Sequence, residues 1–440
     1  MRPRVLIVGG GFAGLAAARS LAKAPVDVLV VDRRNHHVFQ PLLYQVATAS
    51  LSPADICAPI RTILRNQKNC QVAMAKVTEI DISQGRIRAN GQYLQYDYLV
   101  LACGATHAYF GHEEWSQLAP GLKSINDATE LRRRILLAFE SAEFEGDEAA
   151  RLQALTFGIV GGGPTGVELA GAIKEIAGKS IPKDYRHVDT RTTHVILFEA
   201  GTRLLPQFSP ELSERARRDL VQMGVDVRLN AKVTGITSKT IHVGGEAIPV
   251  HNLVWAAGVR ACSLTSALGA PVDRAGRLIV EADLTIPGYR NVFAIGDTAA
   301  AISADNGRPI PGLAQPAIQM GRHVGRIIAH ESRSRGSDRS DQTMRPPFSY
   351  RDKGMMAVVG KARAVVEIRH FKCGGFLAWL MWGGIHVLSL IGFRNRLQVL
   401  LIWFWNWLLN ARDARLITGD VEVDVRIARM TEFNRDEKSS

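Results

Sequence analysis

The sequence predicts an α/β protein in which one strand-turn-helix-strand unit occurs twice and a strongly apolar region follows. The first unit opens with an apolar run at Arg4–Val8, a glycine-rich turn and small residues at Leu15–Ala24 that are typical of a helix. The second unit opens in the same way at Phe157–Val160. One such turn is common by chance, but two of them, each between a strand and a helix, indicate two related domains with parallel sheets.

The first turn has the spacing G-x-G-x-x-G and consists of Gly9, Gly11 and Gly14. The first glycine permits the tight turn, the second lacks the Cβ that would collide with a pyrophosphate, and the third lets helix and strand pack closely. The phosphates would then lie at the helix N-terminus. The next apolar run, Val26–Val31, leads to Asp32, about 20 residues after the turn, where a carboxylate can bind an adenosine ribose. The first domain is therefore predicted to bind a dinucleotide.

The rest of the first domain is expected to surround that dinucleotide. Asn35–Ile56 has too little apolar periodicity to be only scaffold, so we expect a loop and helix start that reach toward the ligand. Strands at Val72–Ile82 and Arg86–Ala89 lead to a buried strand at Leu99–Thr106. The small residues around Gly104 would let the backbone pass close to a ligand there.

A second dinucleotide domain is predicted beyond a helix at Asp127–Glu145 and a polar boundary at Gly146–Arg151. Its turn consists of Gly161, Gly163 and Gly166. The following strand leads to Glu199, which can bond the free 2′-hydroxyl of a nucleotide and repel a 2′-phosphate. A helix at Pro210–Met223 and an apolar strand that ends in small residues at Gly258 complete this domain.

After this second domain we expect the chain to return to the first. Val292–Asp297 is typical of a buried strand that ends in an acid, Ala314–Ala317 opens a helix, and Glu331–Met344 is typical of a polar linker. A hairpin is expected at Phe348–Ile368, with its turn at Asp352-Lys353-Gly354. The predicted domains are residues 1–150 and 271–330 for the first dinucleotide fold, 151–270 for the second, and 345–440 for the C-terminal region.

The C-terminal region is apolar enough to meet a membrane. Gly374–Phe393 is a twenty-residue stretch without a charge, a short arginine cluster follows, and Leu397–Leu409 is again apolar. A crossing helix needs about 20 apolar residues, but five glycines, His386 and the adjacent arginines disfavour one here, and the second stretch is too short to return. We expect two interfacial helices, with the arginines facing lipid headgroups; a buried core or dimer interface is the alternative. Four tryptophans at helical spacing should favour the interface: Trp379, Trp382, Trp403 and Trp407.

Composition restricts the compartment and the partners. The chain has 440 residues, 46% of them hydrophobic and 22% charged, which is ordinary for a folded protein. The net charge of +12 is spread along the chain and suits an anionic membrane surface or nucleic acid without deciding between them. The five cysteines have no metal or redox-pair spacing, so no disulfide and no metal site is expected. The glycine turn begins too close to the first residue for a leader peptide, so we expect the protein on the cytosolic side.

Several short motifs resemble those of a known enzyme family. They are FQPLLYQVAT, GGGPTGVELAG, AAGV, AQPAIQ, the Asp-Lys-Gly turn and HVLSLIGFRNRL. Together with both glycine turns and VFAIGD, they are similar over nearly the whole chain to the type II NADH dehydrogenases, the single-subunit NADH:quinone oxidoreductases with two dinucleotide folds. The resemblance implies FAD in the first fold, NADH in the second, two-electron reduction of a membrane quinone without proton pumping, and monotopic attachment to the cytoplasmic face of the cell membrane.

The resemblance also implies roles for individual residues. Asp297 would hold the flavin ribityl chain, and the helix start at Ala314 would direct backbone N–H groups at the flavin pyrimidine, where negative charge develops on reduction. Catalytic or positioning roles beside the flavin and the quinone would fall on Glu168, Gln315, Gln319 and Lys353. Plainer explanations stay open: a turn acid for Asp297, a solvated helix face for the glutamines, the helix dipole for Glu168 and common turn chemistry for Lys353.

Three rival classes share parts of this pattern. A soluble disulfide reductase and a sulfide:quinone oxidoreductase both need reactive cysteines near the flavin, and Gln40–Gln45 contains none. A basic NADH-sensing or nucleic-acid-binding flavoprotein would fit the positive charge, but that charge is diffuse and no recognition motif accompanies it, so no nucleic-acid partner is expected. The oligomeric state stays open, with a homodimer as one option.

Overall fold

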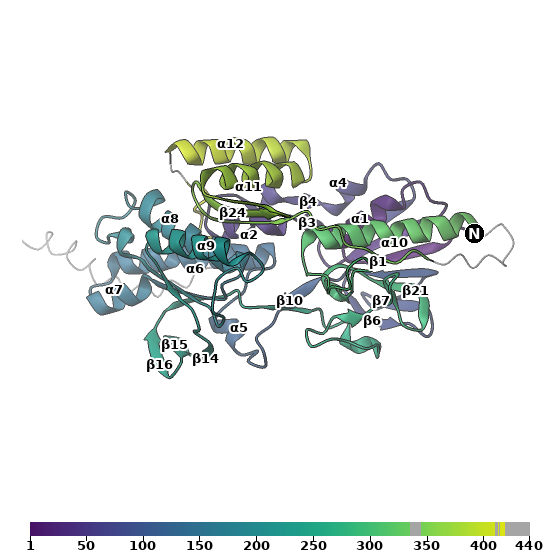
Figure 1. Ribbon diagram of the computed structural model, residues 1–440, viewed down its shortest axis with the longest axis horizontal. Helices are drawn as coiled ribbons and strands as arrows, with labels where there is room; N and C mark the ends of the chain where they lie inside the picture. The colour runs from purple at the N-terminus through teal and green to yellow at the C-terminus, as the bar shows by residue number, and fades with distance from the viewer. Residues whose placement is uncertain (335–344, 410–411, 413, 419–440) are drawn as a thin grey trace, which may run out of the picture. The chain divides into compact units, whose positions relative to one another are not determined.

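The apolar runs of the sequence form the central, parallel strands of two separate sheets in a computed structural model of the chain (Figure 1). The structure describes residues 1–334, 345–409, 412 and 414–418. The chain forms two compact units, each assembled from three stretches of sequence. Unit 1 contains Met1–Val38, Cys57–His107 and Val259–Lys353, and unit 2 contains Phe39–Ile56, Ala108–Gly258 and the described residues from Gly354 onward. The predicted functional domains are a different division of the chain and stay a prediction.

Unit 1 is built on a six-stranded sheet with β1 (Arg4–Val8) inside it. The strand order is β20 (Thr285–Ile286), β21 (Tyr289–Ala294), β9 (Tyr98–Leu101), β1, β2 (Asp27–Asp32) and β5 (Cys70–Met74). Because β1 is parallel to both β2 and β9, the strand order reverses on either side of it. The carboxyl ends of β1 and β9 therefore form a topological switch point, where open α/β sheets bind their ligands.

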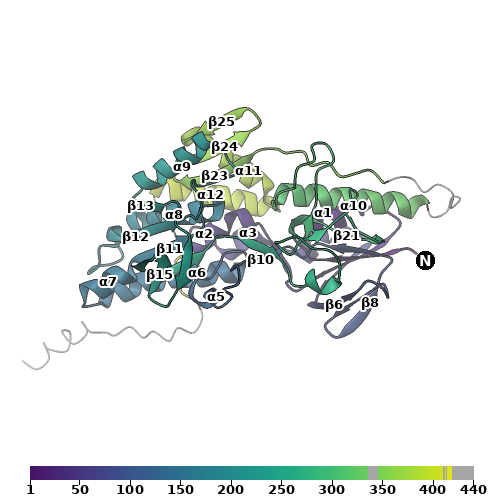
Figure 2. The same ribbon diagram turned by 60° about the horizontal axis from the view of Figure 1, so that its bottom comes forward.

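Helix α1 (Phe12–Ser20) packs along α10 (Ala314–Ser334), as both views show (Figures 1 and 2). Glycines make this contact close: a Cβ on Gly321 would lie 2.2 Å from the Ala13 carbonyl oxygen, and one on Gly325 would lie 2.5 Å from Ser20 Cβ. The start of α10 is therefore held at a fixed place beside the first glycine turn.

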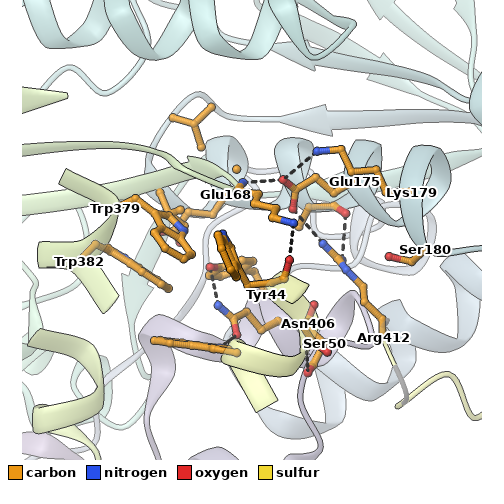
Figure 3. A pocket seen from close by; sticks show the side chains of 18 residues that line it. Tyr44, Ser50, Glu168, Glu175, Lys179, Ser180, Trp379, Trp382, Asn406 and Arg412 are labelled. Atoms are coloured by element: carbon orange, nitrogen blue, oxygen red, sulfur yellow. Dashed lines mark hydrogen bonds and ion pairs between the residues drawn. The ribbon is translucent and has the colours of Figure 1, made fainter. Parts of the chain in front are cut away.

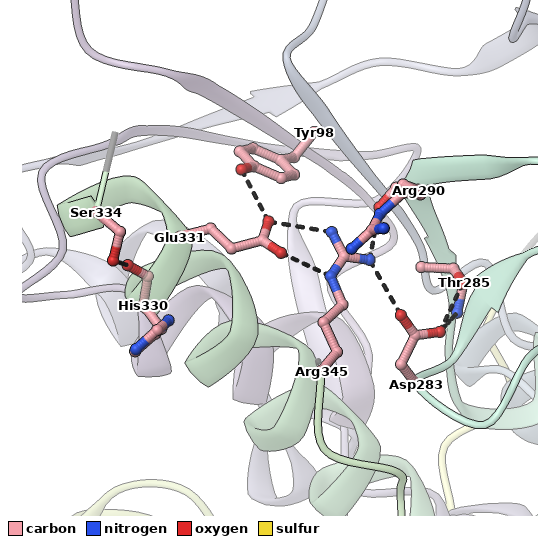
Figure 4. Close-up of polar contacts among 8 residues, drawn as sticks. All are labelled: Tyr98, Asp283, Thr285, Arg290, His330, Glu331, Ser334 and Arg345. Carbon is pink, nitrogen blue, oxygen red and sulfur yellow. Dashed lines mark hydrogen bonds and ion pairs between the residues drawn. The ribbon is translucent and has the colours of Figure 1, made fainter. Parts of the chain in front are cut away.

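Arg345, the first described residue after Ser334, binds this part of the chain to α10 (Figure 4). Its guanidinium donates to both carboxylate oxygens of Glu331 on α10, at 2.6 and 3.0 Å, and to Asp283 at 3.1 Å. The Tyr98 hydroxyl also donates to Glu331, at 3.0 Å. The Arg345 side chain is only 9% exposed, and bidentate pairs of this kind are the stronger ion pairs.

The remaining elements of unit 1 are short. They are β3 (His36–Val38), β4 (Cys57–Pro59), α4 (Ile60–Leu64), β6 (Val77–Asp81), β7 (Arg86–Ala89), β8 (Gln92–Gln95), β10 (Ala105–His107), β18 (Val259–Ala261), η4 (Ser266–Leu268), β19 (Leu278–Ile279), η5 (Gly296–Thr298) and β22 (Ala299–Ala300). The single strand predicted at Val72–Ile82 is thus two strands, β5 and β6, in different sheets. The strand predicted at Leu99–Thr106 is likewise divided, because the backbone leaves the sheet at Ala102–Gly104.

Unit 2 repeats the arrangement with a four-stranded parallel sheet. The strand order is β13 (Val225–Arg228), β12 (His194–Phe198), β11 (Thr156–Val160) and β17 (Asn252–Trp255). The switch point lies between β11 and β17, and α8 (Pro164–Glu175) follows β11. A π-helical turn, η2 (Ile176–Ser180), continues α8. The smaller elements are η1 (Gln40–Leu42), α2 (Leu43–Ala47), α3 (Pro53–Ile56), α5 (Trp115–Leu118), α6 (Ile125–Phe144), α7 (Glu148–Ala154), η3 (Thr190–Thr192), α9 (Pro210–Gln222), β14 (Val233–Ile236), β15 (Thr240–Val243) and β16 (Glu246–Pro249).

The C-terminal part of unit 2 is an antiparallel sheet followed by two helices. The sheet contains β23 (Met355–Gly360), β24 (Arg363–Ile368) and β25 (Phe371–Gly374), and α11 (Phe376–Ser389) packs on it beside α12 (Phe393–Leu409) (Figures 1 and 2). Strand β23 also packs on α8. None of the described helices combines the length and apolar character that crossing a bilayer requires.

One predicted boundary contains a helix, and one predicted turn is wrong. The polar stretch Gly146–Arg151 contains the first half of α7, because Asp147 caps that helix by accepting a hydrogen bond from the Ala150 N–H, and its role as a domain boundary stays a prediction. The hairpin turns at Lys361–Ala362 between β23 and β24, with Ala362 at φ 62°, and not at Asp352–Gly354. The polar linker expected at Glu331–Met344 falls largely outside the described residues, and Glu331–Ser334 belongs to α10.

Candidate functional site

The first glycine turn forms a tight cradle in unit 1. Gly9 has a left-handed φ of 109°, and a Cβ there would lie 2.2 Å from the Ala102 carbonyl oxygen at the end of β9. A Cβ on Gly14 would lie 1.9 Å from the Gly9 carbonyl oxygen, so neither position admits another residue. A Cβ on Gly11, the N-cap of α1, would meet nothing within 4 Å. The turn is therefore closed toward the sheet and open above the helix N-terminus, as a phosphate requires.

Asp32 holds this turn from the end of β2. One carboxylate oxygen accepts the Gly10 N–H at 2.6 Å and the other accepts the Arg34 N–H at 2.8 Å. His37 supports the turn as well, since its Nδ1 lies 3.3 Å from the Gly10 carbonyl oxygen and its ring contacts Phe12 edge-on. Burial lowers the pKa of His37 to about 4, so the ring is neutral at physiological pH. Sequence reasoning missed His37, because its partner is a backbone atom.

Gly104 and Asp297 lie on segments next to the first glycine turn, since Ala102 and Cys103 adjoin Gly9 and Gly296 adjoins Ala13. Gly104 has φ 72°, and its N–H donates to the Thr298 hydroxyl at 3.0 Å. Asp297 lies in η5, which packs on α10, so it is close to the helix start at Ala314 and Gln315. These four residues and the first glycine turn, which the sequence predicted to act together, thus all belong to unit 1.

Gln319 and Lys353 are linked through a backbone contact. The Gln319 amide donates to the Arg351 carbonyl oxygen at 3.0 Å and accepts the Arg351 N–H at 3.1 Å. The side chain therefore pairs with the chain two residues before Lys353. This geometry gives Gln319 a way to position Lys353.

The second glycine turn has the same geometry in unit 2. Gly161 has φ 113°, and a Cβ there would lie 2.6 Å from the Ala256 carbonyl group at the end of β17. A Cβ on Gly166 would lie 1.9 Å from the Gly161 carbonyl oxygen, and Gly163 faces open space. Glu199 accepts the N–H groups of Gly162 and Gly201, both at 2.6 Å. The two turns thus share a first glycine at positive φ, a third glycine packed against the backbone, and a carboxylate that accepts a backbone N–H of the turn. Gly258 follows β17, and a Cβ on Gly258 would lie 2.8 Å from the Phe110 ring.

A pocket of about 120 Å³ lies within unit 2 (Figure 3). A cavity of about 150 Å³ in another protein admits benzene, so this pocket has the size of one ring. Its walls come from α2, α8, η2, β23, α11 and α12. Figure 3 shows Trp379 and Trp382 on one side and Glu175, Lys179 and Arg412 on the other.

Glu168, on the first turns of α8, lines this pocket. Burial raises the pKa of its carboxyl to about 8, although the Val358 N–H donates to it. Tyr44 is 7% exposed. Burial raises the pKa of its hydroxyl well above the usual value, and the nearby Glu168 carboxyl adds a smaller effect in the same direction. At neutral pH both groups therefore carry a proton and can donate it.

A chain of hydrogen bonds orients Tyr44. The Trp403 indole N–H donates to the Gln45 amide oxygen at 2.7 Å, and the Gln45 amide nitrogen donates to the Tyr44 hydroxyl oxygen at 2.8 Å. Because an indole nitrogen can only donate, the amide orientation is fixed. Trp382 is buried and stacks on Trp403, with ring centroids 5.2 Å apart. Both rings form a wall of the pocket, and the interfacial position expected for Trp382 is wrong because its side chain is 3% exposed.

The other end of the pocket is a buried ion pair. Arg412 donates to Glu175 at 3.1 Å and to the carbonyl oxygens of Thr48 and Ala172 at 3.0 and 3.1 Å. Its side chain is 9% exposed. No sequence signal separated Arg412 from the other arginines. For Tyr44 and Gln45 there was a signal, because two polar residues stand within the otherwise apolar segment of α2.

Comparison with known proteins assigns the chain to a family. The family model for pyridine nucleotide-disulphide oxidoreductases matches residues 3–321. Two type II NADH:quinone oxidoreductases of Mycobacterium tuberculosis, Ndh and NdhA, are 41% and 42% identical to the chain over 95% and 96% of its length, and the matches cover 90% of each relative. The chain belongs to the type II NADH:quinone oxidoreductases.

Solved structures agree with this family at the level of the fold. NDH2 of Plasmodium falciparum, solved in complex with NADH, matches with a TM-score of 0.84 at 19% identity, over 95% of this chain and 100% of that one. The sulfide:quinone oxidoreductase of Aquifex aeolicus matches with a TM-score of 0.69 at 16% identity, over 95% and 93% of the two chains. Identities this low show a common fold alone.

FAD and NADH are the cofactors of this family, and the first glycine turn of unit 1 leaves the space that the phosphates of such a cofactor need. The open space above Gly11 accommodates a pyrophosphate that any larger residue would obstruct. The same argument applies to NADH at Gly163 in unit 2. Both glycine turns therefore have room for a phosphate group, and the assignment of one cofactor to each stays a prediction.

Proposed function

We propose that this protein oxidises NADH and reduces a membrane quinone through FAD. The main observation behind this proposal is that both glycine turns have the same geometry, in a chain of this family. Each crevice combines an open helix N-terminus with a carboxylate that is held by the adjacent glycine turn. Two such sites in one chain suit a flavin and a nicotinamide nucleotide.

FAD, when bound, accepts a hydride from NADH and returns two electrons to the quinone. In unit 1 the helix N-terminus at Gly11 would hold its phosphates and Asp32 its ribose. Asp297 would hold the ribityl chain. The first N–H groups of α10, at Ala314 and Gln315, would stabilise negative charge at the pyrimidine end, because the positive end of the helix dipole lies there.

NADH would bind in unit 2, with its phosphates at Gly163. Glu199 would accept the ribose 2′-hydroxyl and repel the 2′-phosphate of NADPH. Both oxygens of Glu199 already accept backbone N–H groups, so the carboxylate is held in place before the nucleotide arrives. Gly258 would let the backbone pass close to the bound nucleotide.

We place the quinone ring in the pocket of unit 2. Its aromatic wall suits a ring, and its two protonated groups suit the product, because a quinone takes up two protons with two electrons. Gln45 donates to the Tyr44 oxygen, so the Tyr44 hydroxyl proton is available for a quinone carbonyl. Glu168 would give a proton to the other carbonyl or restore the one that Tyr44 loses.

Lys353 and Gln319 would contribute from unit 1. By the family resemblance Lys353 would place a positive charge near the quinone end of the flavin. Gln319 would act through the Arg351 backbone, which its amide clamps on both sides. Gln319 is then a positioning residue for the segment that carries Lys353.

Attachment to a membrane surface would bring this site to an apolar quinone. Large apolar side chains of α11 and α12 are exposed, among them Leu388, Phe393 and Phe404 at 69%, 80% and 59%. Together with the net charge of +12 they suit the anionic cytoplasmic face, where the protein would be peripheral, would pump no protons and could pair as a homodimer.

Anaerobic spectroscopy tests the whole proposal. NADH added to the purified yellow protein should bleach the flavin absorbance near-stoichiometrically, and an added quinone should restore it. Acid precipitation should release the flavin, because no covalent attachment is expected. If NADH bleaches the flavin absorbance but quinone does not restore it, the assignment of FAD and NADH stands and that of the quinone is wrong. A colourless purified protein would contradict both assignments.

A further inference from the structure

Phe110 is an exposed aromatic residue beside the end of β17 in unit 2, outside the roles described so far. It is 70% exposed. The tip of its ring, Cζ, lies 2.8 Å from the place that a Cβ on Gly258 would take, and the ring is tilted against Trp255 with centroids 6.4 Å apart. A single exposed apolar residue is ordinary on a protein surface, so exposure alone assigns it no role.

The backbone at Phe110 is strained. Its φ is 54°, and Gly111 after it has φ 96°. A left-handed φ is rare for a bulky residue, because its Cβ approaches the following carbonyl oxygen, and residues held in this way concentrate at binding and catalytic sites. The fold therefore keeps this ring in an unfavourable conformation and yet leaves most of it uncovered.

Neighbouring residues fix the position of the ring. The Ala108 N–H donates to the Gly258 carbonyl oxygen at 3.1 Å, and the Trp255 indole N–H donates to the Ala108 carbonyl oxygen at 2.8 Å. Tyr109 is 3% exposed and stacks on Trp255 with ring centroids 5.2 Å apart. The segment that carries Phe110 is thus attached to the end of β17.

The strand order of unit 2 decides which half of a bound nucleotide would reach that ring. In the parallel sheet, β12 and β17 lie on opposite sides of β11. Gly163 precedes α8 after β11, Glu199 follows β12, and Gly258 follows β17. With the phosphates at Gly163 and the adenosine ribose at Glu199, the nicotinamide half would extend toward Gly258.

We propose that Phe110 packs on the nicotinamide ring of the bound nucleotide and orients it, an inference that rests on the proposed NADH site of unit 2. Aromatic rings stack on one another, and the face of a phenyl ring also attracts the positively charged nicotinamide ring of NAD⁺. The strained backbone is then retained because it presents the ring to the ligand. ADP-ribose has the phosphates and the adenosine of NAD⁺ but no nicotinamide, so its binding should not depend on Phe110.

Calorimetric titration of the oxidised, FAD-loaded protein tests this proposal. NAD⁺ and ADP-ribose are the ligands, because neither of them reduces a flavin. In Phe110→Ala the Kd of NAD⁺ should rise by about tenfold, since a stacked ring with a charged partner is lost, while the Kd of ADP-ribose should stay unchanged. Phe110→Tyr should restore NAD⁺ binding and Phe110→Leu should not. Phe371→Ala, which removes another exposed phenylalanine of unit 2, should leave both constants unchanged.

Two results would overturn the proposal: an unchanged Kd of NAD⁺ in Phe110→Ala, or an equal loss of affinity for NAD⁺ and ADP-ribose. Either result would leave the NADH site of unit 2 in place, because the unmodified protein would still bind both ligands. An unmodified protein that binds neither ligand would instead contradict that site, and the role of Phe110 with it.

Thermal unfolding separates ligand binding from packing. Glycine adopts φ 54° without strain, so Phe110→Gly should unfold at the same temperature as the unmodified protein or at a higher one. It should bind NAD⁺ as weakly as Phe110→Ala does. A clearly lower unfolding midpoint in both variants would show that the ring stabilises the fold through Gly258 and Trp255 and is no ligand contact.

Discussion

Among single residues, Glu168 should set the pH dependence of quinone reduction. Burial raises the pKa of its carboxyl to about 8, so it holds a proton below that pH and loses it as the pH rises through that value. We expect flavin reoxidation by quinone to slow above about pH 8. Glu168→Gln cannot supply a proton, and it should be slower by about 10²-fold below pH 8 and independent of pH across this range.

Rapid mixing separates this step from flavin reduction by NADH. Flavin reduction should change little in the Glu168→Gln variant. Ser50→Ala, which alters the same pocket without removing a titratable group, should keep the normal pH profile. An unchanged pH profile in Glu168→Gln would show that another group donates the proton. Equal slowing of flavin reduction and flavin reoxidation would show that Glu168 supports the structure and not the proton transfer.

Glu199 should decide between the two nicotinamide nucleotides. Glu199→Ala removes the charge that repels a 2′-phosphate and frees the N–H groups of Gly162 and Gly201. The ratio of kcat/KM for NADH to that for NADPH should fall by about tenfold or more, mainly because the NADPH value rises. Arg203 lies close in sequence and can then face the phosphate. Steady-state kinetics with both nucleotides measure this ratio, and a preference for NADH that survives the change would contradict the role of Glu199.

Among the elements, α8 depends on a glycine where it meets β23. A Cβ on Gly171 would lie 1.7 Å from the Val359 carbonyl oxygen, a backbone atom that cannot move aside alone. Gly171→Ala should therefore separate the helix from the strand at a cost of about 3 kcal/mol, the upper part of the range for overpacking. It should also slow quinone reduction, because both elements line the pocket.

Gly178→Ala provides the matched control for this element. Gly178 lies in η2, and a Cβ there would meet nothing within 4 Å. Its thermal unfolding midpoint should stay near that of the unmodified protein, whereas Gly171→Ala should unfold at a clearly lower temperature. Equal midpoints for the two variants would show that α8 and β23 can adjust to the added methyl group.

The sequence predicted elements best where one local signal decided them. Strands β1 and β7 begin and end as expected, and both glycine turns have the predicted geometry, because strand ends and left-handed glycines are local. The hairpin turn was misplaced because Asp-Lys-Gly is common turn chemistry, while Ala362 adopts φ 62° without any sequence signal. The pocket was not predictable, since Trp403 and Gln45 are 358 positions apart in the chain.

At the scale of the whole molecule, one face of α12 should attach the protein to lipid. Leu401 and Phe404 are 58% and 59% exposed on that helix. Changing both to glutamine should weaken binding to anionic lipid vesicles by about tenfold or more, because buried apolar groups supply much of the affinity of interfacial helices. Reduction of a water-soluble acceptor by NADH should be retained.

Leu152→Gln is the control for the vesicle experiment, because Leu152 is 51% exposed on α7 of the same unit. It should sediment with vesicles as the unmodified protein does. Raising the salt concentration should weaken binding in all variants, since the net positive charge also contributes. Unchanged sedimentation of the Leu401 and Phe404 variant would assign attachment to another surface.

The contacts of Arg345 with Glu331, Asp283 and Tyr98 should allow the chain to be cut between residues 335 and 344 without loss of the fold. Glu331, near the end of α10, and Arg345, after residues 335–344, are already bound to each other, and Asp283 and Tyr98 hold the same group. These hydrogen bonds and ion pairs therefore connect the two segments without the peptide link between them. A protease site placed between residues 335 and 344 should yield two fragments that stay together through gel filtration, and the same position should accept an inserted tag or domain. Arg345→Ala should lower the thermal unfolding midpoint of the cleaved protein more than that of the intact chain, because the cleaved chain has no covalent link beside the ion pair.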